Sequence, residues 1–236
     1  MTAPGSPTAP TAFFHPPVPP VEAFVALPAP ELIARYRKGV ENFDRRLFWL
    51  SESQIDQAFL PDSGGAGVGR WPIRVLLGHL ADAELAFVAR LRKTVAEDRP
   101  VLQPWDEQAF IDANMYGNAP HGAAASAEAD KARVAAALGG FVAVVHTLRQ
   151  WTGQWLATLG DEQLAREAMH PERGVQSVRT ILAYDTWHLE HHARFLRMKV
   201  DRILGEAAIR ERAADDAAAA AGGSCGPGCG CFSKKA

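Results

Sequence analysis

Three histidines are the residues of this 236-residue sequence with the clearest capacity for chemistry. His188 and His192 stand four apart in the run YDTWHLEHHARFL, a spacing that places side chains one above the other on one face of a helix. They can therefore offer two imidazoles to a single ion. His79, in the run GHLADAE, lies on another apolar stripe and could complete a three-histidine set if the two helices pack face to face. Such a set leaves coordination positions for water or substrate, as catalytic metal sites do.

Asp185 is the carboxylate best placed to assist this set. It precedes His188 by one turn on the same face, where it could accept the N–H of a ligating imidazole or act as a general base. A solvent-exposed helix carboxylate is an equally open interpretation. The histidines also have an ordinary alternative, because an HxxxH pair arises by chance and a lone core histidine is usually hydrogen-bonded. The apolar neighbours of His188 favour a metal, since a buried imidazole needs a partner to offset its desolvation.

Further polar residues flank the same motifs. Asp82 lies one turn after His79 and could orient that imidazole, whereas Glu84 is expected to pair with Arg90 or to face solvent. His170, in the segment before the last helix, could reach the mouth of the site or cap its own loop. His191 is expected near the surface or behind the ligands.

The elements that must position these residues are helices. Apolar residues recur every three or four positions and predict long helices over about 30–50, 72–96, 126–159 and 177–204, with a short helix near 107–114. No segment shows sustained alternation with a period of two, so strands are not expected. The prediction is an all-α four-helix bundle with a polar cluster on its inner faces. The connection 97–125 contains scattered aromatic residues and is expected to line a binding mouth.

The two ends of the chain differ from this pattern. Residues 1–28 are rich in proline and alanine and are expected to form a disordered tail. The bundle is expected over 29–212, followed by an Ala/Gly linker and a Cys-containing tail over 213–236. All three cysteines, Cys225, Cys229 and Cys231, lie in that last segment, so the bundle itself offers no thiolate. They could bind a soft ion such as Cu(I) or Zn(II), or form a flexible end with redox-labile thiols.

Charge and hydropathy narrow the class of partner. The sequence has 25 Lys and Arg against 27 Asp and Glu, so no basic surface for nucleic acid or an anionic membrane is expected. No uncharged apolar stretch long enough for a membrane span is apparent, and no signal-peptide pattern precedes the helices. We therefore expect a cytoplasmic protein with a small-molecule substrate and without nucleic-acid or membrane partners, and leave a homodimer open.

Two longer runs, WPIRVLLGHLADAELAFVARLR and HPERGVQSVRTILAYDTWHLEHHARFLRM, resemble the DinB/YfiT-like superfamily of four-helix metalloproteins. The resemblance covers about residues 30–205. Beside the histidines it includes Trp71, Asp82, Gly174 and Asp185. Pro72 departs from the Ser or Thr that the family usually has as a helix cap, a difference that concerns helix initiation.

The resemblance implies a metal site more specifically than a reaction. It implies that His79, His188 and His192 hold one divalent ion, commonly nickel or zinc in this superfamily, which includes metal-dependent hydrolases, thiol S-transferases and maleylpyruvate isomerase domains. We therefore expect a metal-dependent transferase or hydrolase that activates water or a low-molecular-weight thiol. The alternative is a non-enzymatic metal-handling protein that uses both the histidine site and the cysteine tail.

Overall fold

The computed structural model describes residues 15–59, 68–117 and 126–222, with side chains as far as 205. Contacts within the chain separate a unit that ends at Val200 from a second unit that begins at Asp201. All three candidate histidines belong to the first unit. The candidate cysteines Cys225, Cys229 and Cys231 lie outside the described residues.

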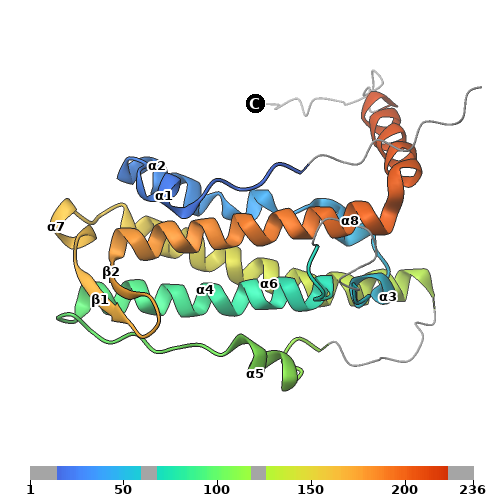
Figure 1. The fold of residues 1–236 in the computed structure, drawn as a ribbon. Helices are drawn as coiled ribbons and strands as arrows, with labels where there is room; N and C mark the ends of the chain where they lie inside the picture. The colour runs from blue at the N-terminus through green and yellow to red at the C-terminus, as the bar shows by residue number, and fades with distance from the viewer. Residues whose placement is uncertain (1–14, 60–67, 118–125, 223–236) are drawn as a thin grey trace, which may run out of the picture. The chain divides into compact units, whose positions relative to one another are not determined.

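The described part of the chain is mostly helical, as Figure 1 shows. Its α-helices are α1 (Val21–Val25), α2 (Ala29–Arg37), α3 (Glu52–Ile55), α4 (Ile73–Ala96), α5 (Glu107–Asp112), α6 (Ala127–Leu156), α7 (Asp161–Leu164) and α8 (Val178–Gly222). Two 3-10 turns, Gly39–Asn42 and Arg45–Trp49, follow α2, and two short strands, β1 (Glu167–His170) and β2 (Gly174–Ser177), precede α8.

The core of the first unit lies between α2, α4, α6 and α8, which run alongside one another (Figure 1). Apolar residues at three- and four-residue spacing on each helix supply it, as the periodicity predicts; among them Leu80, Leu138, Leu182 and Leu189 are all at most 1% exposed. The predicted all-α four-helix bundle is therefore confirmed.

The first bundle helix is shorter than predicted. Instead of one helix over 30–50, α2 ends at Arg37 and the chain continues in 3-10 turns through Trp49. At Gly39 the backbone passes so close to the Arg149 guanidinium that a Cβ atom would collide with it. Sequence periodicity could not distinguish these turns from a continuous helix, because 3-10 turns also bring apolar residues to one side at three-residue spacing.

The predicted N-terminal tail is also too long. Residues 15–28 are described, and within them α1 buries Phe24 completely in the core. The Arg179 guanidinium of α8 donates hydrogen bonds to the carbonyls of Val25 and Leu27 and fixes this segment. The composition of residues 1–28 was a poor guide because five residues, VEAFV, suffice for this anchor.

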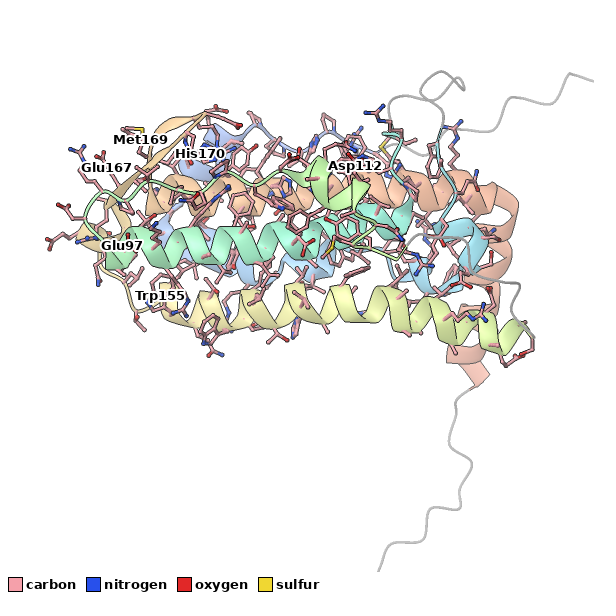
Figure 2. All side chains as sticks on the ribbon, turned by 90° about the horizontal axis from the view of Figure 1, so that it is seen from below. Glu97, Asp112, Trp155, Glu167, Met169 and His170 are labelled. Carbon is pink, nitrogen blue, oxygen red and sulfur yellow. The ribbon has the colours of Figure 1, made fainter. Side chains whose placement is uncertain are left out.

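The expectation that the chain has no strands is wrong at one place. β1 and β2 form an antiparallel hairpin in which His170 pairs with Gly174. Gly174 adopts a φ of +72°, which favours glycine at the turn. Four-residue strands are too short to show a period-two pattern. The labelled residues Glu167, Met169 and His170 in Figure 2 mark this hairpin at the end of the bundle where α4 stops near Glu97.

The long helix α6 qualifies the expectation of no membrane-spanning segment. Among the described helices it alone is long and apolar enough to cross a membrane, judged by length and composition. Core helices of soluble proteins meet the same test. Only 17% of its apolar window is buried, and the exposed large side chains include Val144 and Trp151.

The final helix is interrupted close to the predicted end of the fourth helix. Gly205, with φ 70° and ψ 166°, interrupts α8 one residue after Leu204, where the apolar stripe stops. The backbone is helical again from there to Gly222.

Candidate metal centre

The three predicted ligands converge, although His79 is 109 residues from His188 in the chain. One ring nitrogen from each of His79, His188 and His192 lies within 4.8 Å of the others. The Nε2 atoms of His79 and His188 are 3.2 Å apart. Two nitrogens bound to one tetrahedral ion at about 2.0–2.1 Å would be roughly 3.3 Å apart, so this pair is already at the spacing that an ion requires.

Burial keeps these imidazoles neutral, which is the form that binds metal. Burial lowers the pKa of His79 to about 4. Burial and then the neighbouring His79 and His191 lower the pKa of His192 to about 3. The pKa of His188 is also well below its ordinary value, first through burial and then through His192 and His79. All three side chains are therefore ready to bind a cation at neutral pH without losing a proton.

The chemistry of the donors provides a second test of fit. His79 faces His188 with its Nε2 atom, so its Nδ1 atom, which is buried without a hydrogen-bond partner among the described residues, lies on the side of the ring away from a shared ion. Nδ1 of His192 is also buried without a partner among the described residues. Three converging nitrogen donors suit zinc, nickel and similar divalent ions. The residues present therefore fit a resident metal ion.

Aromatic rings surround the histidines. Trp105 stacks on His79 with ring centroids 5.2 Å apart, and Tyr184 stacks on His188 at 6.4 Å. Trp71, Phe87 and Phe195 complete the shell, at 5.0 Å from His79, 5.8 Å from His188 and 6.2 Å from His192. Trp105 comes from the connection between α4 and α5, so an aromatic residue of the segment predicted to line the mouth contacts a candidate ligand.

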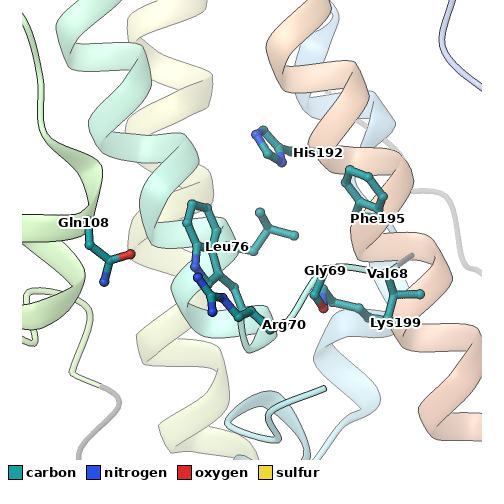
Figure 3. Close-up of a pocket in the computed structure, with 9 residues that line it drawn as sticks. Val68, Gly69, Arg70, Leu76, Gln108, His192, Phe195 and Lys199 are labelled. Carbon is teal, nitrogen blue, oxygen red and sulfur yellow. The ribbon is translucent and has the colours of Figure 1, made fainter. Parts of the chain in front are cut away.

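A cavity of about 250 Å³ opens beside His192 (Figure 3). Its walls are mainly apolar and include Leu76 of α4 and Phe195 of α8, with Gln108 of α5 facing them across the opening. The Lys199 ammonium group lies at the same cavity, where it donates a hydrogen bond to the carbonyl of Gly69. A small apolar molecule could therefore approach the histidines from this side.

The structure places Asp185 in a different group of residues. Its Oδ1 accepts a hydrogen bond from Nη2 of Arg149 at 2.7 Å, and its carbonyl accepts another at 3.2 Å. Burial and then the charge of Glu84 raise the pKa of Asp185 well above its usual range. Its Oδ2 atom has no hydrogen-bond partner in the described structure. Whether Asp185 assists His188 stays a prediction, because the contacts that hold its carboxyl group are to Arg149.

Arg149 is the centre of a buried cluster that the sequence did not reveal. Its Nε donates to Glu84 at 2.6 Å, and the Tyr36 hydroxyl donates to the other oxygen of Glu84 at 2.5 Å. Arg149 and Tyr36 are fully buried and Glu84 is 1% exposed. The expectation that Glu84 faces solvent or pairs with Arg90 is therefore wrong. The available signal was position: Arg149 shares a helical stripe with the buried Val145 and Leu156.

The remaining polar candidates lie away from the ligand nitrogens. Asp82 makes no hydrogen bond to His79, whose Nδ1 has no partner among the described residues. The His170 Nδ1 atom accepts hydrogen bonds from the backbone N–H groups of Glu172 and Arg173, so His170 caps its own turn. His191 is partly buried and stacks on Trp187 at 4.7 Å.

Comparison with known proteins agrees with this geometry. The sequence profile described as the DinB superfamily matches residues 21–196, about three quarters of the chain and all three histidines. The solved structure of YfiT from Bacillus subtilis, described as "a probable metal-dependent hydrolase with an unusual four-helix bundle topology", is similar with a TM-score of 0.55. That likeness covers 75% of this chain and 87% of YfiT at 21% identity, and it shows the fold.

Curated relatives carry the same description. The sequence is 25% identical over 148 residues to "Putative metal-dependent hydrolase YfiT" of Bacillus subtilis, covering 61% of this chain and 67% of the relative. Two proteins of Oceanobacillus iheyensis with the same functional description are 27% identical over 143 residues and 24% identical over 182 residues. These matches cover 61% and 74% of this chain, and 69% and 89% of the relatives.

Proposed function

Because the chain belongs to the DinB superfamily, we propose that it is a metal-dependent enzyme in which His79, His188 and His192 hold one divalent ion. An ion held by three imidazoles supplies a Lewis acid that makes water, or a small thiol, nucleophilic at neutral pH. The proposed reaction is attack on a small electrophile, either hydrolysis or transfer to the thiol. Zinc and nickel are the proposed ions.

The convergence of the three imidazoles beside an open cavity carries this proposal. Structural metal sites are closed by four protein ligands, whereas three histidines leave room for a reactant. Among the described residues no other histidine, cysteine or carboxylate joins this donor set. The hydrolase description of the relatives supports the same class of chemistry.

The side chains of this protein have three tasks in the proposed reaction. The buried histidines present neutral nitrogens, which burial maintains by lowering the pKa of each ring. The stacked Trp105 and Tyr184 fix the planes of His79 and His188 and exclude water from one side. The apolar wall near Leu76 and Phe195 would bind the apolar part of an electrophile.

Metal analysis of the purified protein tests the site. We expect about one divalent ion per chain, because one set of three imidazoles is available. His188→Ala should abolish this stoichiometry, whereas His146→Ala, which removes an exposed histidine of α6, should leave it unchanged. An unchanged metal content in His188→Ala would contradict the three-histidine assignment.

Turnover then distinguishes the classes of function. The metal-loaded chain should convert an activated ester in water, or couple a small thiol to a model electrophile; a requirement for the thiol identifies a transferase. The His188→Ala variant serves as the control without the ion. If the protein passes its ion to a chelator and converts neither the ester nor the thiol with its electrophile, the result would instead support the metal-handling alternative.

A further inference from the structure

A second cavity lies close to the histidines and has a different lining. It measures about 190 Å³ and is formed by α4, the connection before α5, the β1–β2 hairpin and α8. Phe87, Trp105 and Tyr184 line it, and each of these rings also contacts His79 or His188. Unlike the apolar cavity at His192, it contains two guanidinium groups.

The two guanidinium groups belong to Arg90 and Arg173. One Nη2 atom of Arg90 donates to the carbonyl of Gln103 at 3.0 Å, and Nη2 of Arg173 contacts Nε2 of His170. In the described structure neither forms an ion pair within 4.0 Å, whereas Arg35, Arg74, Arg99 and Arg149 each do. Each guanidinium carries five N–H donors, so most of the donors of Arg90 and Arg173 are available to a ligand.

The cavity contains charges of both signs. Glu107 and Glu172 are also part of the lining, so an acidic contribution is present. Burial and then the charge of Arg173 lower the pKa of Arg90, and Glu172 opposes this effect less strongly. Burial and then the same two guanidiniums lower the pKa of His170, so that ring stays neutral. The charges of Arg90 and Arg173 therefore oppose each other, and a bound anion would relieve this repulsion.

Both guanidiniums lie one aromatic ring away from a metal ligand. The Arg173 guanidinium is 4.6 Å from the centroid of Tyr184, which stacks on His188. The Arg90 guanidinium is 5.6 Å from the centroid of Phe87, which contacts the same histidine at 5.8 Å. A substrate that extends past these rings could therefore place one end at the guanidiniums and the other at the histidines.

We propose that Arg90 and Arg173 form a binding site for an anionic group, a carboxylate or a phosphate, on the molecule that reacts at the histidines. Planar guanidiniums match both groups geometrically, and such charge-assisted hydrogen bonds are the strong ones. The substrate is then a small molecule with an anionic end held between α4 and the hairpin. This inference rests on the proposed function for its link to catalysis, but the anion site itself requires no ion at the histidines.

Calorimetric titration of the full-length protein with succinate and, separately, with inorganic phosphate tests this site. We expect one of the two anions to bind more tightly, and that anion identifies the class of group. Arg90→Gln and Arg173→Gln should each weaken its binding at least about tenfold, as expected for a hydrogen bond to a charged group. Glu172→Gln should strengthen it severalfold, because a competing carboxylate is removed.

Control variants separate this site from general charge effects and from the metal. Arg99→Gln removes the same charge from an exposed arginine paired with Glu167 and should not change the affinity. Arg173→Lys keeps the charge and should retain part of the binding if the fold is intact. Loss of anion binding in His188→Ala, with unchanged affinity in both glutamine variants, would mean that the anion binds the metal and would overturn the proposal. Absence of binding by either anion would overturn it as well, even if metal analysis supports the histidine site.

Discussion

Two polar clusters lie on neighbouring turns of α4 and α8, and they differ in the hydrogen-bond partners that their side chains find. Glu84 and Asp185 meet Arg149, which bonds both carboxyl groups and two backbone carbonyls. His79 and His188 meet His192 at a place where two ring nitrogens have no partner among the described residues. The first cluster contains its own counter-charges, whereas the second contains only neutral donors of a lone pair.

The difference teaches how buried polar groups divide between structure and function. A network whose members satisfy one another specifies how the helices pack, since any other packing would leave charges unpaired in the core. A cluster of neutral rings with converging nitrogens contains no counter-charge of its own and fits a ligand that accepts lone pairs. We therefore expect the Arg149 cluster to determine stability and the histidine cluster to determine metal binding.

The largest expected effect that tests this division is on stability. Arg149→Met should lower the free energy of unfolding by about 3–5 kcal/mol, because it leaves two carboxyl groups buried without their cation. His188→Ala, measured on metal-free protein, should cost clearly less, because it removes a group whose neighbours already lack partners. Denaturant unfolding of both variants measures the difference. Equal losses in the two variants would remove the distinction between the clusters.

The two clusters should also respond to pH with opposite sign. The folded-state pKa values of His79 and His192 are lowered from 6.5 to about 4 and about 3. Their contribution to the free energy of unfolding is therefore complete above about pH 6.5 and is lost as the pH falls toward the lowered values. The pKa of Asp185 is raised above its usual value of 3.8. The contribution of Asp185 to the free energy of unfolding is therefore complete below about pH 3.8 and is lost as the pH rises through the raised pKa.

Denaturant unfolding of metal-free protein between pH 7 and pH 4 measures the histidine part. We expect the wild type to lose about 1–3 kcal/mol more than His79→Gln over this range, because glutamine does not titrate. A parallel loss in both proteins would show that His79 is not buried in its neutral form. Asp185→Asn, which also does not titrate, is the matched control for the opposite trend.

Asp185→Asn also tests whether the two clusters communicate. Asparagine preserves the shape of the side chain, so we expect the variant to retain its metal ion. If Asp185 acts as a base or orients His188, activity should fall about 10- to 100-fold, the usual effect of a residue that supports a metal ligand. Activity equal to wild type, with altered stability alone, would confine Asp185 to the Arg149 cluster.

The smallest expected effect is that of removing the cysteine segment. Truncation after Ala221 deletes Cys225, Cys229 and Cys231 but none of the residues that contact the histidines. The unfolding midpoint and the ion held by the histidines should be unchanged, and any additional soft-metal binding should disappear. Loss of the histidine-bound ion in the truncated protein would show that the cysteine segment contributes to the centre.

The sequence by itself determined the helical class, the three long helices that contain buried stripes and the candidate ligands. Helical periodicity and the four-residue spacing of His188 and His192 involve residues close together in the chain, so they can be recognised from the sequence alone. The composition also showed that the bundle lacks cysteine. Short elements could not be predicted from periodicity, because neither α1 nor the four-residue strands are long enough to show a repeating pattern.

Only the tertiary structure decided which polar residues meet. Asp185 lies one turn from His188 in the sequence, yet its carboxyl group is held by Arg149, 36 residues away on another helix. Glu84 read as a surface residue because its partners, Arg149 and Tyr36, come from different segments of the chain. The pairing of Arg90 with Arg173 at one cavity has the same origin. Periodicity shows which face of a helix is buried, but the partner that each buried group finds depends on how the helices pack.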